Sequence, residues 1–118
     1  MKKHLQAIAV VSLLLPAAVF AQANTPRVDQ RQANQEQRID QGVASGALTQ
    51  REANRMERGQ QHVENMENRA KADGVVTRRE RARLHQAQEV ESRRIYAQKH
   101  DRQHDYNHNG LVDRPRRR

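Results

Sequence analysis

The sequence predicts an all-α protein of three helices joined by short turns that contain glycine, in a helical-hairpin repeat. The first observation is an internal repeat: residues 46–52 (Gly-Ala-Leu-Thr-Gln-Arg-Glu) match residues 74–80 (Gly-Val-Val-Thr-Arg-Arg-Glu). The second is the pattern Thr-x-x-Glu in each copy, which is typical of a capping box at the start of a helix. The third is the Arg- and Gln-rich sequence after each copy, which lacks clusters of Pro or Gly. The repeat therefore predicts a turn and a helix start at two places in the chain.

The expected helices span residues 26–43, 50–72 and 78–104. The first should begin with Thr25 as its N-cap and Pro26 at its first helical position, where the fixed φ of proline suits a helix. Gly46 and Gly74 permit positive φ in the two connecting turns. Because these turns are short, neighbouring helices should run antiparallel. The apolar seam between the second and third helices is narrow and interrupted by Gln, as in a weak coiled coil.

Few large side chains are available to form a core. The chain has no Cys and no Trp, and its only Phe lies in the first 23 residues. No disulfide can therefore compensate for a small core. We expect marginal stability, with a homodimer or a bound ligand as possible sources of additional stability.

The N-terminus has the features of a signal peptide over residues 1–23. Lys2 and Lys3 form a positive region, a short apolar run follows, and Ala21 and Ala23 supply the small residues of a cleavage site. The run is too short to span a bilayer comfortably. We therefore expect an exported protein, periplasmic or secreted, with no membrane span after cleavage. The remainder divides into a helical domain, 24–104, and a loop with an Arg-rich tail, 105–118.

Three histidines near the C-terminus, His100, His104 and His108, recur every four residues. On a helix this spacing places imidazoles along one face, beside the carboxylates of Asp101 and Asp105. Two neighbouring rings with a carboxylate or water would suit Zn²⁺ or Cu²⁺. The alternative is a solvated, polar helix end. We favour the histidine face as the metal site.

A second metal-binding pattern overlaps the first. The oxygen ligands at positions 1, 3, 5 and 9 of an EF-hand calcium loop would be Asp105, Asn107, Asn109 and Asp113. Gly110 stands at position 6, where the loop turns sharply, and Leu111 would lend its carbonyl oxygen. This segment resembles an EF-hand or dockerin-type calcium loop, but Arg116 replaces the bidentate Glu of position 12. The predicted Ca²⁺ affinity is therefore weak, and the alternative is an Asn-Gly turn with side-chain-to-backbone hydrogen bonds.

The two repeated turns resemble the second half of such a loop without its first half. Before the second turn, Arg69 and Lys71 occupy positions where carboxylates would be needed. Two cations there should repel calcium. We interpret both turns as capped helix connections that bind no metal.

Several segments between Gln30 and Asp101 resemble small exported proteins of Gram-negative bacteria that carry no assigned activity. The segments are Arg-Ile39-Asp-Gln-Gly, Gly-x-Leu48-Thr-x-x-Glu and Ile95-Tyr96-x-x-Lys99-His100-Asp101. The resemblance implies export and helical architecture. Residues 48–52 are also similar to the Leu-Thr-x-x-Gln motif of periplasmic envelope-stress chaperones and metal-stress sensors, with Glu52 in place of Gln.

Two classes of function follow from these patterns, and neither is enzymatic. No nucleophile stands near His and Asp at a recognisable spacing, and no glycine-rich phosphate loop occurs. The first class is a periplasmic metal binder that uses the C-terminal His and Asp segment and needs no organic cofactor. The second is a helical envelope interaction or stress-response protein that binds another protein or an envelope polyanion, as a formal charge of +8 favours. Specific nucleic-acid binding is not expected, because aromatic residues do not alternate with the arginines.

Overall fold

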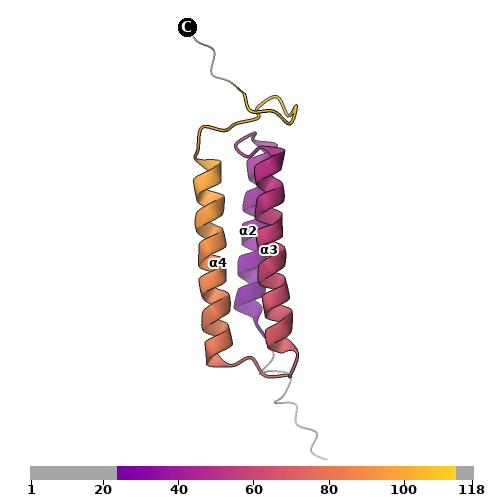
Figure 1. Cartoon of the computed structure of the whole chain (residues 1–118), viewed down its shortest axis with the longest axis vertical. Coiled ribbons are helices and arrows are strands. Elements are labelled where there is room, and N and C mark those ends of the chain that lie inside the picture. Colours follow the sequence, from indigo (N-terminus) through magenta and orange to yellow (C-terminus); the bar gives the residue numbers. More distant parts are fainter. Residues whose placement is uncertain (1–23, 114–118) are drawn as a thin grey trace, which may run out of the picture.

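The computed structural model describes residues 24–113 and shows three helices packed side by side (Figure 1). The helices are α2 (Pro26–Ala44), α3 (Gln50–Lys71) and α4 (Arg78–Lys99). Each helix packs against the other two, and no strand occurs within residues 24–113. The predicted all-α class is confirmed. The predicted signal peptide, 1–23, and the arginines at 114 and 116–118 lie outside the described residues.

The two repeated turns have the predicted geometry. Gly46 and Gly74 have φ of +73° and +81°, a region that favours glycine. Thr49 and Thr77 cap α3 and α4, and both capping boxes are complete. In the first box the Thr49 N–H donates to Oε2 of Glu52 at 2.9 Å, while Oγ1 of Thr49 accepts from the Glu52 N–H at 3.4 Å. The internal repeat therefore marks two equivalent helix starts.

The start of α2 differs from the prediction. Thr25 is the N-cap residue, but its side chain makes no cap hydrogen bond. Its hydroxyl donates instead to Oε1 of Glu67 on α3. Since both groups are buried, this bond attaches the first turn of α2 to the last turns of α3.

The end of α4 is also different: the expected helix to residue 104 is wrong, because the helix stops at Lys99. His100 leaves the helical conformation at φ −117° and ψ 11°. Immediately afterwards, Oδ1 of Asp101 accepts a hydrogen bond from the Gln103 N–H at 2.7 Å. Side chains that bond nearby backbone groups in this way compete with helical hydrogen bonds.

The core consists of two apolar clusters separated by a polar layer. The upper cluster contains Ile39, Leu48, Ala53, Met56 and Ile95; the lower contains Ala70, Val76 and Leu84, with Val28 and Met66 packed against it. Between them lie three buried amides, one from each helix: Gln35, Gln60 and Gln88. Gln60 Nε2 donates to Gln35 Oε1 at 3.1 Å, and Gln35 Nε2 donates to the Gln88 carbonyl at 2.8 Å. The glutamines that interrupt the apolar pattern therefore join the three helices.

Gly59, in the interior of α3, makes room for a buried carboxylate. A Cβ at this position would lie 2.1 Å from Oε2 of Glu91 on α4. Glu91 is buried, and its Oε1 accepts a hydrogen bond from Arg94 at 2.7 Å. Glycine costs about 1 kcal/mol relative to alanine inside a helix. At Gly59 the absence of a side chain allows close contact between α3 and α4.

We expect Glu67→Gln to destabilise the bundle at neutral pH and to flatten its acid sensitivity. Burial raises the pKa of Glu67, but hydrogen bonds from Lys71 and Thr25 and the Lys71 charge outweigh it, so the net pKa is lowered. A lowered carboxyl pKa stabilises the fold above the ordinary value of 4.5, and this contribution is lost as pH falls. The pKa of Asp29 is raised by burial and by Glu67, which offsets part of the effect.

The measurement is urea unfolding at pH 7 and pH 3. Glu67→Gln should lower the free energy of unfolding at pH 7 by about 1.5–3 kcal/mol, the usual range for a hydrogen bond to a charged group, and by less at pH 3. The control is Glu64→Gln, which changes an exposed carboxylate on the same helix. Equal losses at both pH values would contradict the role of the Glu67 charge.

Candidate metal centre

The C-terminal segment, residues 100–113, crosses from the end of α4 to the turn between α2 and α3 (Figure 1). The Asp105 N–H donates to the Gly46 carbonyl at 2.9 Å. A Cβ on Gly46 would lie 2.6 Å from the Asp105 carbonyl oxygen and 2.7 Å from Cα of Tyr106. Gly46 thus serves both the turn and the close approach of the segment, which holds the loop against the bundle.

The predicted calcium loop, residues 105–113, is folded around the carboxylate of Asp105. This residue is 5% exposed. Its Oδ1 accepts a hydrogen bond from the Asn109 N–H at 3.0 Å, and its Oδ2 accepts one from the Gly110 N–H at 2.8 Å. Gly110 has φ +80°, as a sharp turn at position 6 requires. The chain therefore curls around the group predicted to be the first ligand.

The other predicted oxygen ligands belong to the same hydrogen-bonded loop. Oδ1 of Asn107 accepts from the Asn109 N–H at 3.0 Å, and Oδ1 of Asn109 accepts from the Leu111 N–H at 2.8 Å. Asp113 closes the loop: its Oδ1 accepts from Nδ2 of Asn107, and its Oδ2 from the Tyr106 N–H, both at 2.7 Å. The structure thus brings Asp105, Asn107, Asn109 and Asp113 together in one short loop.

The histidines do not form the predicted helical face, because α4 ends at Lys99 before the first of them. His100 stacks on Tyr96, with Nδ1 2.7 Å from the Tyr96 carbonyl oxygen. His104 stacks on Tyr106, and its Nδ1 is buried without a hydrogen-bond partner. His108 is exposed at a φ of +55°. The imidazole site remains a prediction, but it lacks the shared face on which it was based.

No three His, Cys, Asp or Glu side chains gather to hold a metal ion within residues 24–113. The predicted calcium loop, residues 105–113, has a different set of ligands from such a cluster, because it combines two carboxylates with two Asn amides and a carbonyl. Such hard oxygen ligands suit Ca²⁺ rather than Zn²⁺ or Cu²⁺. The donor set of the loop therefore fits calcium best.

The two repeated turns use their polar groups differently. The carboxylates of Glu52 and Glu80 bond the capping threonines. The apolar residues Leu48 and Val76 insert into the upper and lower clusters. Each turn therefore contributes a cap and a core residue to the bundle.

We expect Gly46→Ala to loosen the C-terminal loop as well as the turn. Alanine would be strained at φ +73°, and its methyl group would meet backbone atoms of Asp105 and Tyr106. Limited proteolysis should then cut within residues 100–113 faster than in the parent protein. Gly74→Ala is the control for strain alone, since Gly74 has φ +81° in the other turn and lies outside the segment whose cleavage is measured. Cleavage of the Gly46→Ala protein within residues 100–113 that is no faster than in the parent protein would contradict the role of the contact between Gly46 and this segment.

The sequence indicates that Gly46 is a turn residue but not that the C-terminal loop packs against it. The two positions are distant in the chain, and the contact involves backbone atoms. A glycine in a turn carries no signal that separates these two roles.

No helix in the stretch 24–113 is long and apolar enough to cross a membrane. Comparison with protein families, with curated proteins and with solved structures gives no match for this chain.

Proposed function

We propose that residues 105–113 bind a divalent cation, with Ca²⁺ as the best fit, and that the three-helix bundle is a non-enzymatic support for this loop. The observation that carries the proposal is the position of Asp105. Both of its carboxylate oxygens accept backbone N–H groups of the loop. Binding therefore needs little ordering of the backbone around the first ligand.

The affinity should be weak. Only Asp105 and Asp113 carry charge among the predicted ligands, and Arg116 stands in the sequence where a bidentate Glu would be. Calcium sites with fewer charges fall toward dissociation constants of about 0.1–1 mM, the range of extracellular modules. This range agrees with the proposed export of the protein.

This proposal reverses the preference that the sequence alone gave to Zn²⁺ or Cu²⁺. Calorimetric titration with Ca²⁺, Zn²⁺ and Cu²⁺ at pH 7 and pH 5.5 tests it. Ca²⁺ should bind at both pH values, because none of the proposed ligands in the loop is an imidazole. The imidazole site would instead be established if Zn²⁺ or Cu²⁺ bound more tightly than Ca²⁺ and if this binding were lost in His104→Ala. Binding at the imidazole site should also weaken at pH 5.5, since protonated His cannot ligate.

A second candidate function is supported by the surface of α4. Its exposed arginines are Arg78, Arg79, Arg81, Arg83, Arg93 and Arg94. Arginine is well suited to carboxylate and phosphate groups. We retain the binding of an acidic envelope partner or polyanion as the alternative.

A further inference from the structure

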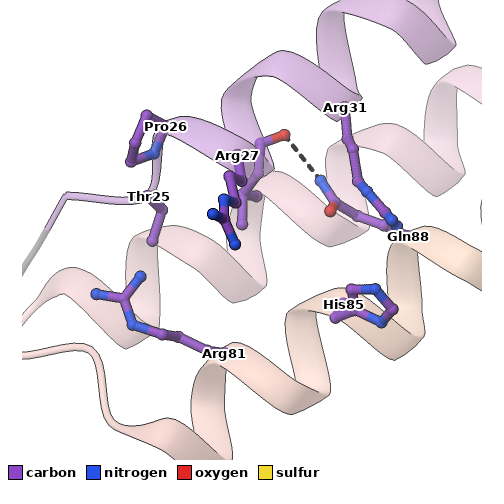
Figure 2. A pocket seen from close by; sticks show the side chains of 8 residues that line it. Thr25, Pro26, Arg27, Arg31, Arg81, His85 and Gln88 are labelled. Atoms are coloured by element: carbon purple, nitrogen blue, oxygen red, sulfur yellow. Dashed lines mark hydrogen bonds between the residues drawn. The ribbon is translucent and has the colours of Figure 1, made fainter.

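A cavity of about 460 Å³ lies between the first turns of α2 and the first half of α4. Figure 2 shows Arg27 reaching from α2 toward α4, with Arg81 and His85 on the facing helix. Arg27 lies in the first turn of α2 and Arg81 in the first turn of α4, whereas the C-terminal loop contacts the turn that follows the end of α2. The cavity and the proposed calcium loop are therefore at opposite ends of the bundle.

The charge of the cavity is strongly positive. Arg27, Arg31, Arg81 and His85 line it, and no Asp or Glu does. One carboxylate lies at its margin: Oε1 of Glu89 is 2.6 Å from Arg31 and 3.9 Å from Nε2 of His85. Arg31 lowers the pKa of Glu89, so this carboxylate is charged at neutral pH. This carboxylate lies beside Arg31, while Arg81 donates a hydrogen bond to the Asn24 carbonyl at 3.3 Å.

Apolar side chains line the cavity beside the arginines. Pro26 and Val28 line it, and Val28 also packs against the lower apolar cluster. The buried Gln88 side chain donates to the Val28 carbonyl at 2.9 Å, which satisfies that backbone group (Figure 2). The stems of the arginines add further methylene groups. Apolar and cationic groups therefore line the same cavity.

The N-terminus of α2 adds to the attraction for anions. A helix carries partial positive charge at this end. The Thr25 side chain, which could have capped it, is engaged by Glu67 instead. This contribution reinforces the arginines but would not define a site without them.

We propose that this cavity binds a small amphipathic anion, with a carboxylate or phosphate head at Arg27 and Arg81 and a short apolar tail over Val28. Arginine matches both head groups through paired N–H donors. The volume lies within the range of small-molecule pockets. A volume of about 460 Å³ can accommodate a medium-chain acyl or alkyl anion.

Calorimetry on the full-length protein tests the proposal with two probes, decanoate and decyl phosphate. Each probe is used below its micelle concentration. Both probes should bind at least tenfold more tightly than acetate, which has the charge without the tail. They should also bind at least tenfold more tightly than decyltrimethylammonium, which has the tail with the opposite charge. The tighter of the two probes distinguishes a carboxylate ligand from a phosphate ligand.

Variants locate the site. Arg27→Gln combined with Arg81→Gln should weaken binding of the preferred probe at least tenfold, and Arg27→Gln alone should weaken it about threefold. The matched control is Arg79→Gln, an exposed arginine on α4 that does not line the cavity. Circular dichroism should show that all three variants keep the helical fold.

Three results would overturn the proposal. They are acetate binding as tight as that of decanoate, equal weakening by Arg79→Gln, and full binding by folded Arg27→Gln, Arg81→Gln protein. The experiment is independent of the calcium loop, because it contains no divalent cation and changes no residue between 100 and 113.

Discussion

Replacing Leu84 by alanine is expected to unfold most of the protein at room temperature or to lower its melting temperature by more than about 10 °C. Leu84 has no exposed surface and lies in the lower cluster with Ala70 and Val76. Truncation of a buried leucine costs about 2–5 kcal/mol, partly because a cavity remains. A domain of this size has a total stability of only about 5–15 kcal/mol.

Thermal unfolding followed by circular dichroism measures this effect. In a domain of 60–100 residues, each kcal/mol corresponds to roughly 4–8 °C. The control is Val75→Ala, which shortens an apolar side chain that is 39% exposed in the adjacent turn. A Leu84→Ala protein that melts within 2 °C of the parent would mean that the lower cluster does not hold the bundle together.

Replacing Asp105 by alanine is expected to abolish Ca²⁺ binding while leaving the three helices intact. The change removes the first ligand and the acceptors for the Asn109 and Gly110 N–H groups. The backbone bond from Asp105 to Gly46 can persist, since it does not use the side chain. The loss should therefore be confined to the loop.

Asp101→Ala provides the matched control for this variant. Asp101 is a carboxylate in the same segment and accepts one backbone N–H, from Gln103, but it lies outside the loop. Calorimetry should show at least a tenfold loss of Ca²⁺ affinity for Asp105→Ala and a change below twofold for Asp101→Ala. Equal losses would indicate a diffuse attraction between Ca²⁺ and the acidic groups of the segment.

The helices were predictable because their signals are local. The capping boxes at Thr49 and Thr77 and the glycines at 46 and 74 depend on residues only a few positions apart, and all four behave as predicted. The end of α4 was not predictable from the four-residue spacing of His. That spacing fits a helix, but α4 ends at Lys99 and a turn at Asp101 follows.

The contacts among the three buried glutamines, and the contact of the C-terminal loop with Gly46, could not be predicted from the sequence. Gln35, Gln60 and Gln88 appear in the sequence as breaks in an apolar seam, and only packing reveals that they bond one another. Likewise, the basic cavity joins Arg27 to Arg81, which lie on different helices. Contacts between distant residues leave no periodic pattern in the chain.

We propose that residues 105–113 form a calcium loop, and two-dimensional ¹H–¹⁵N NMR during a Ca²⁺ titration tests this proposal because it reports each backbone amide separately. The predicted result is a saturable shift of the Asn109, Gly110 and Leu111 amides, with the amides of α2 and α3 unchanged except near Gly46. Titration that leaves these three amides unmoved, or that shifts signals around His100 and His104 instead, would contradict the claim.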